Sequence, residues 1–253
     1  MARNHDPLTH TQRERAESFG QIAAQYDQYR PSYPVALVDD LLAGGAERVL
    51  DLGCGTGKAG RLFAARGADV LGVEIDPAMA EVARGHGLTV EVAPFEEWDD
   101  ARRRFDLVIA GQAWHWIDPQ VAAPKIVRLL APGGELAVFW NFGELADEER
   151  RIAEAVYRDV APGLVRGPTV GTDDSHRRRL EESGCFSTVE AVTYPSRREW
   201  SIDDWIGVLA THSDHLLLGD RLPVLLDRLR TALTERGPVV HTTGGTYLLR
   251  ARP

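Results

Sequence analysis

The stretch Asp51-Leu52-Gly53-Cys54-Gly55-Thr56-Gly57 decides the fold of this chain. The apolar run Arg48-Val49-Leu50 before it predicts a buried strand, and Lys58 to Arg66 after it predict a helix that ends at Gly67. Alternating glycines let the backbone approach a ligand where no Cβ would fit, and the start of the helix offers unpaired N–H groups to a negative group. The stretch therefore predicts a ligand-binding loop, with a simple glycine turn that binds nothing as the alternative.

An acidic residue stands at the end of the next predicted strand. The strand 69–74 ends in Glu74, seventeen residues past Gly57. An acid in this place can accept hydrogen bonds from both hydroxyls of a ribose. We therefore expect a cofactor that contains adenosine.

Two cofactors fit such a loop. Gly55 to Gly60 matches the G-x-G-x-x-G pattern of dinucleotide-binding proteins, a weak signal when it stands alone. Asp51 at the strand end would instead repel a pyrophosphate and attract a ligand ammonium. The run Val49 to Gly57 resembles the first motif, V-L-D-L-G-C-G-T-G, of the class I S-adenosylmethionine-dependent methyltransferases. A nicotinamide dinucleotide is the rival ligand, and Asp51 and the short interval to Glu74 argue against it.

Hydrophobic patterns in the first half alternate between strand and helix, which predicts a parallel sheet covered on both faces. The predicted strands are 48–52, 69–74, 88–93, 105–110 and 134–140. Asp76-Pro77 and Asp118-Pro119 each predict the start of a helix, with an acid at the N-cap and proline at the first helical position.

The second half has a different pattern. We expect helices over 144–184, broken at Pro162-Gly163 and Gly167-Pro168, then a strand over 187–194, helices over 202–236 and a strand over 246–250. The resemblance implies one Rossmann-like α/β domain over 1–253, whose seven-stranded, mostly parallel sheet has an antiparallel last strand and helices on both faces. It also implies an N-terminal helical lid (1–33), a cofactor-binding core (34–142), and C-terminal strands whose helical insertions form a substrate lid (143–253).

Bulk properties exclude several classes. A net charge of -9 and a pI near 5.4 argue against nucleic-acid binding, which needs clustered Lys and Arg. Residues 1–18 lack the apolar core of a signal peptide, and no stretch approaches the ~18 apolar residues of a membrane span. His212 and His215 are three apart with no third ligand evident, so no metal is expected. We expect a cytoplasmic monomer or homodimer.

The resemblance also implies which residues hold S-adenosylmethionine. Asp51 would orient the methionine ammonium, Glu74 would bind the ribose, and Ile75 would pack on the adenine. The remaining cofactor candidates are the loop glycines Gly53, Gly55 and Gly57, then Phe95 and Glu96 near the adenine, and Gly111 and Gln112 near the methionine moiety.

The segment Trp114-His115-Trp116 follows the fourth predicted strand, where the methyl group emerges in this family. The His-Trp pair resembles the trans-aconitate and juvenile hormone acid methyltransferase branch. Aromatic faces stabilise a sulfonium cation, and His115 could accept a proton from a hydroxyl or amine. A carboxylate acceptor would need no base. The tryptophans could instead simply cover an edge of the core.

Lid residues complete the site. The segment Tyr26 to Pro34 resembles the Y-D-x-x-R-P-x-Y-P signature that precedes the first motif in many small-molecule methyltransferases. Tyr26, Arg30 and Tyr33 are therefore candidates to line the pocket, with Arg30 holding the cofactor carboxylate or an acidic substrate. Packing of the two tyrosines onto the sheet is the alternative. Trp205 and His212 could share a helix face that points at the substrate.

The sequence as a whole predicts an enzyme that transfers a methyl group from S-adenosylmethionine to a small molecule. Oxygen, in a hydroxyl or a carboxylate, is favoured over nitrogen or carbon as the acceptor. Two alternatives remain: a cofactor-binding module without catalytic activity that acts through protein contacts, and a nicotinamide-dependent oxidoreductase.

Overall fold

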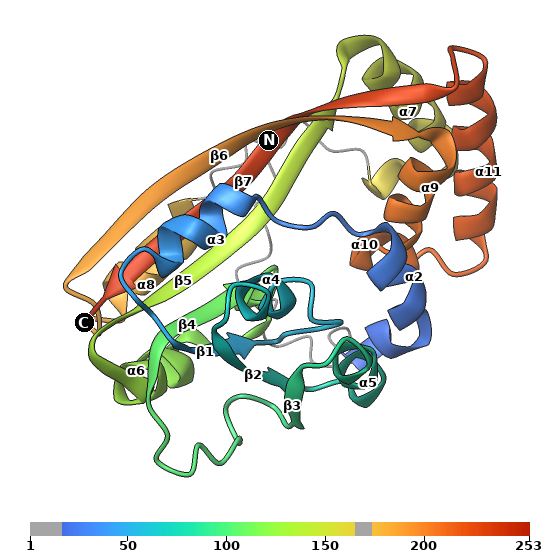
Figure 1. Ribbon diagram of the computed structural model, residues 1–253. Coiled ribbons are helices and arrows are strands. Elements are labelled where there is room, and N and C mark those ends of the chain that lie inside the picture. The colour runs from blue at the N-terminus through green and yellow to red at the C-terminus, as the bar shows by residue number, and fades with distance from the viewer. Residues whose placement is uncertain (1–16, 165–173) are drawn as a thin grey trace.

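The computed structural model describes residues 17–164 and 174–253 (Figure 1). Expectations for residues 1–16 and for the break at Gly167-Pro168 lie outside these ranges. Within the described residues one seven-stranded sheet has the order β3-β2-β1-β4-β5-β7-β6. Its strands are β1 Arg48–Leu52, β2 Asp69–Glu74, β3 Thr89–Val92, β4 Phe105–Gly111, β5 Leu130–Leu145, β6 Thr188–Ser201 and β7 Val239–Arg252.

Strand directions agree with the predicted fold. The strands β3, β2, β1, β4 and β5 pair in parallel, and only β7 runs antiparallel to its neighbours β5 and β6. The expected seven-stranded sheet with an antiparallel last strand is therefore confirmed.

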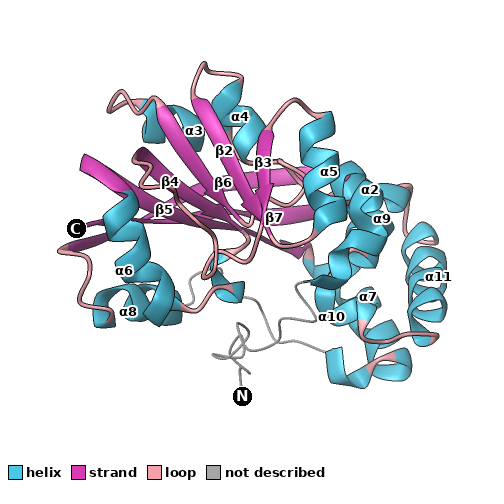
Figure 2. Ribbon diagram, turned by 90° about the horizontal axis from the view of Figure 1, so that it is seen from below, coloured by secondary structure: helices cyan, strands magenta, loops and turns pink. Residues whose placement is uncertain are grey.

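Helices cover both faces of this sheet (Figure 2). One face packs on α3, α4 and α5, and the other packs on α6 and α8. The helices are α2 Ala23–Tyr29, α3 Val35–Leu42, α4 Gly60–Ala64, α5 Pro77–Gly85, α6 Pro119–Leu129, α7 Asp147–Val160, α8 Asp174–Glu182, α9 Ile202–Ala210, α10 Ser213–Leu216 and α11 Arg221–Thr234, with short 3-10 helices η2 Glu17–Ile22, η3 Trp114–Trp116 and η4 Pro162–Leu164.

Two helices begin as predicted. The Asp76 carboxylate accepts hydrogen bonds from the backbone N–H groups of Ala78 and Met79 at the start of α5. The Asp118 carboxylate accepts one from the backbone N–H of Gln120 at the start of α6. Both acids therefore act as N-caps.

The last three strands are longer than the sequence predicts: β5, β6 and β7 have 16, 14 and 14 residues. The predicted ranges 134–140, 187–194 and 246–250 for these strands are therefore too short. Gly244 and Gly245 lie inside β7, where a Cβ would collide with carbonyl oxygens of β5 and β6. Pro195 lies inside β6 and pairs with Gly245.

The long strands carry a separate group of helices beyond the edge of the parallel sheet (Figure 1). α7, α9 and α11 bury their apolar faces around the far ends of β5 and β7 in a core cluster of their own. Contacts of α2 with α9 and of η2 with α5 connect this group to the carboxyl edge of the sheet. No helix in the described ranges is long and apolar enough to cross a membrane.

Candidate active site

The glycine loop follows β1 in a conformation that requires glycine. Gly53, Gly55 and Gly57 have φ angles of 59°, 55° and 81°, a region that other L-residues rarely adopt. A Cβ at Gly53 would lie 2.7 Å from the Cβ of Ala113, and one at Gly57 would lie 2.6 Å from Leu88 Cδ1. Backbone conformation and close packing therefore both account for the glycines.

Asp51 lies buried beneath this loop, with 1% of its surface exposed. Its Oδ2 accepts a hydrogen bond from the backbone N–H of Gly60 at 2.9 Å, whereas its Oδ1 is buried without a partner among the described residues. Burial raises the pKa of Asp51 to about 7, and the nearby Glu74 contributes in the same direction. A buried carboxylate oxygen without a donor is unfavourable unless a ligand supplies one. The site therefore fits the ammonium group of a bound cofactor.

Proton release on cofactor binding would report this contact. A ligand ammonium beside Asp51 stabilises the ionised carboxylate and lowers its pKa. Because the free carboxyl has a pKa of about 7, binding at about pH 6.5 should release a substantial fraction of one proton. Calorimetry of S-adenosylhomocysteine binding in two buffers of different ionisation enthalpy measures this release. Asp51→Asn should abolish it, and an enthalpy independent of the buffer in the wild type would rule out the contact.

Glu74 is the last residue of β2, and its carboxylate forms a hydrogen bond with the same glycine loop. Its Oε2 accepts a hydrogen bond from the backbone N–H of Gly55 at 2.8 Å, and its Oε1 accepts one from the backbone N–H of Asp76 at 2.9 Å. An ionised carboxylate can accept about four hydrogen bonds, so acceptor capacity remains for ribose hydroxyls. Ile75 follows and is half-buried. The Asp76 carboxylate also accepts a hydrogen bond from the backbone N–H of Gly20, which fastens the N-terminal segment beside Glu74.

The loop after β3 carries Phe95 and Glu96, the two candidates for the adenine. Phe95 is buried in the core, with its ring centroid 6.2 Å from that of Trp98. Glu96 Oε1 accepts a hydrogen bond from the backbone N–H of Asp118 at 3.1 Å. Buried Lys125 of α6 donates to the carbonyl oxygens of Phe95 and Trp98 at 2.7 and 2.5 Å. α6 thus holds this loop at two points.

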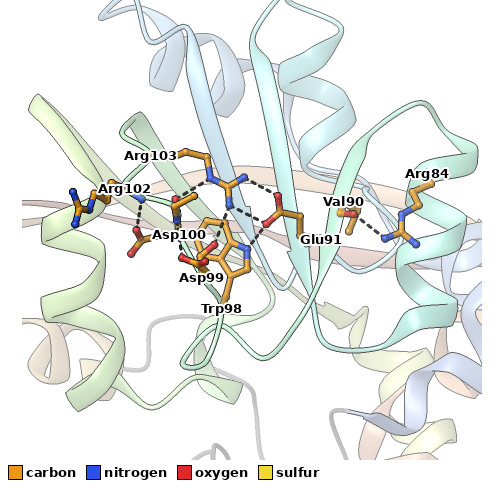
Figure 3. A network of polar contacts seen from close by, with 9 residues as sticks. Arg84, Val90, Glu91, Trp98, Asp99, Asp100, Arg102 and Arg103 are labelled. Atoms are coloured by element: carbon orange, nitrogen blue, oxygen red, sulfur yellow. Dashed lines mark hydrogen bonds and ion pairs between the residues drawn. The ribbon is translucent and has the colours of Figure 1, made fainter.

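A second cation, Arg103, also forms hydrogen bonds with the loop after β3, to the carbonyl oxygens of Asp99 and Asp100 (Figure 3). Arg103 donates from Nη1 and Nη2 to the two carboxylate oxygens of Glu91 at 2.7 and 2.9 Å, and Trp98 Nε1 donates to the same carboxylate. The guanidinium carbon of Arg103 lies 4.8 Å from the Trp98 ring centroid. Sequence reasoning missed both cations. A signal existed for Lys125, since it and Lys58 are the chain's only lysines among 29 Lys and Arg residues.

The end of β4 has an unusual backbone. Gln112 has a φ of 59°, which is rare for a residue with a side chain and typical of functional sites. A Cβ at Gly111 would lie 2.8 Å from the hydroxyl oxygen of Tyr33 and 2.7 Å from the Phe139 ring. The ring of Tyr33 packs edge-on against Phe139 at 4.7 Å. The structure therefore places the side chain of Tyr33, from the N-terminal segment, against the backbone of Gly111 at the end of β4.

The Trp-His-Trp segment forms η3 immediately after this point. Trp114 is 2% exposed and packs in the core, whereas His115 and Trp116 are half-buried, with ring centroids 4.8 Å apart. The indole N–H of Trp140, in β5, points to His115 Nδ1 at 3.3 Å. His115 and Trp116 are therefore the members of the segment that can reach a ligand, and Trp114 has a core position.

His176 of α8 is a third aromatic residue beside His115, after Trp116 and Trp140, and the sequence did not predict it. Its ring stacks on Trp140, with centroids 4.5 Å apart and an interplanar angle of 13°, and lies 6.4 Å from His115. Nothing in the sequence singles it out, because α8 is a strongly polar helix far along the chain.

Arg30 connects the N-terminal segment to the helices above the sheet. It donates from Nε to Thr211 Oγ1 at 2.9 Å and from Nη2 to the carbonyl oxygen of Thr211 at 2.8 Å, and it lies 5.2 Å from the ring centroid of Tyr26. Burial lowers the pKa of Arg30. No carboxylate among the described residues forms an ion pair with it. An anionic ligand would supply the missing charge.

Trp205 and His212 do not share a helix face, because α9 ends at Ala210 and His212 precedes α10. That expectation was wrong: the chain turns between them. Trp205 packs on Trp200 with ring centroids 5.9 Å apart, and His212 packs edge-on against His215 at 5.4 Å.

A third potential metal ligand, which spacing alone did not reveal, lies beside these histidines. Ligand atoms of His212, Asp214 and His215 all lie within 4.8 Å of one another. His215 is engaged already: its Nδ1 lies 2.9 Å from the Asp214 carboxylate and its Nε2 lies 2.7 Å from the Tyr157 hydroxyl. These contacts join α7 to α10.

The chain is similar to known proteins over part of its length. The methyltransferase domain family matches residues 49–134. An uncharacterized methyltransferase of Mycobacterium tuberculosis is 40% identical over 159 residues, which are 61% of this chain and 65%, slightly less than two thirds, of that protein. A trans-aconitate 2-methyltransferase of Methylobacterium radiotolerans is 38% identical over 112 residues, 42% of each chain. The solved structure of a putative type II methyltransferase from Anaeromyxobacter dehalogenans aligns with a TM-score of 0.67 at 25% identity, covering 88% of this chain and 98% of that one.

The matched domain begins in β1 and ends in β5, so it contains the glycine loop, Glu74 and the Trp-His-Trp segment. The sheet of the described residues has the seven strands and the antiparallel last strand that the sequence resemblance implied. Residues 49–134 therefore match the methyltransferase domain family, and the fold around them is similar to that of a solved methyltransferase structure, as the resemblance to class I S-adenosylmethionine-dependent methyltransferases implied.

Proposed function

We propose that this protein transfers a methyl group from S-adenosylmethionine to an oxygen atom of a small molecule. The observation that carries the cofactor assignment is Asp51 Oδ1, a buried carboxylate oxygen without a donor beneath the glycine loop. When bound, the cofactor supplies a methyl group made electrophilic by the sulfonium. The protein's own contribution is to hold the cofactor and an acceptor in line, which can remove much of the entropic barrier.

In this proposal each end of the cofactor has its own partner. Asp51 holds the ammonium, and Glu74 accepts hydrogen bonds from the ribose hydroxyls. Glu96 faces the adenine with Oε2, since only its Oε1 is engaged among the described residues. Gly111 and Gln112 border the methionine moiety, where the unusual φ of Gln112 shapes the backbone.

Two observations favour an acidic acceptor. Arg30 is a half-buried cation without an acidic partner among the described residues, and it lies on the segment that also places Tyr33 at the end of β4. A relative that is 38% identical over 112 residues is named for methylating trans-aconitate. Both support a carboxylate as the acceptor, held by the guanidinium fork of Arg30.

Methyl transfer to a panel of acceptors tests the proposal. The protein is incubated with methyl-labelled S-adenosylmethionine and with carboxylic acids, alcohols, phenols and amines, and products are identified by mass spectrometry. We expect label on oxygen, with carboxylic acids the best class. Label only on nitrogen or carbon would overturn the proposal. Cofactor binding without transfer to any class would favour the non-catalytic alternative.

A further inference from the structure

We propose that Trp140 fixes the proton of His115 on Nε2, so that His115 acts as a hydrogen-bond donor to a carboxylate acceptor rather than as a base. This inference rests on the proposed function for the nature of the acceptor. The position of the proton itself follows from the protein alone.

The hydrogen bond between Trp140 and His115 can have only one donor. Trp140 Nε1 lies 3.3 Å from His115 Nδ1. An indole nitrogen carries a hydrogen and has no lone pair to accept another, so Trp140 can only donate. His115 Nδ1 must therefore accept and carries no hydrogen. The neutral imidazole then has its hydrogen on Nε2, since one ring nitrogen is always a donor.

Packing holds Trp140 in this orientation. Its side chain projects from β5, with 9% of the residue exposed. One neighbour, His176, stacks on it at 4.5 Å, and another, Tyr247, lies 6.4 Å away at an interplanar angle of 26°. Rotating the indole away from His115 would disrupt this stack. The donor is thus held in place before any ligand binds.

The arrangement also disfavours a second proton on His115. An imidazolium carries hydrogens on both nitrogens, so its Nδ1–H would meet the N–H of Trp140. Among the described residues, the rings of Trp116, Trp140 and His176, from η3, β5 and α8, lie close to His115. Because the Trp140 indole faces Nδ1, Nε2 is the nitrogen of the half-buried His115 ring that does not face Trp140.

This proton position selects the class of acceptor. A hydroxyl or amine acceptor must lose a proton during methylation, and Nε2 of this tautomer already carries one. A carboxylate loses none: its oxygen forms the new bond to the methyl carbon, the carbon–sulfur bond breaks, and its electron pair stays on sulfur. An Nε2–H donor can meanwhile hold the second carboxylate oxygen, a charge-assisted hydrogen bond.

Nitrogen-15 NMR of histidine-labelled protein tests the proton position without cofactor or substrate. We expect the His115 signals of the wild type to show a neutral ring protonated on Nε2. Trp140→Phe keeps a stacking ring and removes the donor, so a population protonated on Nδ1 should appear. Trp98→Phe, which removes another indole donor in the same core cluster, should leave His115 unchanged.

Two results would overturn the inference: wild-type His115 protonated on Nδ1, or a Trp140→Phe protein whose His115 protonation equals that of the wild type. The first needs no variant, so it stands even if Trp140→Phe fails to fold. Failure of the proposed function has a different signature, since it would show as the absence of methyl label on oxygen in any acceptor, whatever the position of the proton.

Discussion

His115→Ala should lower kcat/KM for a carboxylate acceptor about 10- to 150-fold, because a hydrogen bond to a charged group contributes roughly 1.5–3 kcal/mol. The loss should depend little on pH, since no proton is transferred. His115→Gln is the matched variant. Its side-chain amide offers an N–H donor but is not a base, so it should recover most of the lost rate. Single-turnover methyl transfer across pH measures both variants.

A base would leave a different pattern. Loss of a general base typically lowers the rate ~10²–10⁴-fold, and high pH partly restores it because the acceptor then ionises by itself. Equal damage in His115→Gln and His115→Ala, with recovery at high pH, would contradict the donor role. Wild-type rates in both variants would remove His115 from the mechanism altogether.

Glu74→Ala should weaken S-adenosylhomocysteine binding by about 1.5–3 kcal/mol and also destabilise the fold. The first effect is the loss of the acceptor for the ribose hydroxyls. The second follows from the structure, because the backbone N–H groups of Gly55 and Asp76 lose their acceptor. Each buried donor left without a partner costs about 1–3 kcal/mol. Calorimetry and denaturant-induced unfolding measure the two effects separately.

Asp106→Ala separates stability from binding. Asp106 accepts hydrogen bonds from the backbone N–H groups of Glu47 and Arg48, at the opposite end of β1 from the glycine loop. Its removal takes the acceptor from two exposed backbone donors, which water can then satisfy, so it should lower stability by less than Glu74→Ala and leave cofactor affinity unchanged. Unchanged affinity in a folded Glu74→Ala protein would show that the ribose is held elsewhere.

The fold could be predicted where local signals are strong. β1 and β2 have the predicted boundaries, since glycines or acidic residues punctuate their apolar runs, and Asp76 and Asp118 cap helices as expected. The extensions of β5, β6 and β7 were missed. Glycine and proline usually indicate turns, whereas here Gly244 and Gly245 permit close approach of three strands.

In the candidate site, too, contacts between residues close in the sequence could be predicted, and contacts between distant residues could not. The glycine loop and Glu74 are neighbours along the chain, so their spacing is visible in the sequence. The contact of Trp140 with His115 joins residues 25 apart, and that of Arg30 with Thr211 joins residues 181 apart. Such pairs depend on how β5 and the helices α2 and α9 pack, which no local pattern encodes.

The central claim is that Asp51 and the glycine loop hold the methionine end of S-adenosylmethionine. Calorimetric titration of wild-type protein and Asp51→Asn with S-adenosylhomocysteine and with nicotinamide adenine dinucleotide tests it most directly. We expect micromolar binding of S-adenosylhomocysteine to the wild type, ~8 kcal/mol, at least about ten-fold weaker binding to Asp51→Asn, and no saturable binding of the dinucleotide. Equal or tighter binding of the dinucleotide, or full affinity in Asp51→Asn, would contradict the claim.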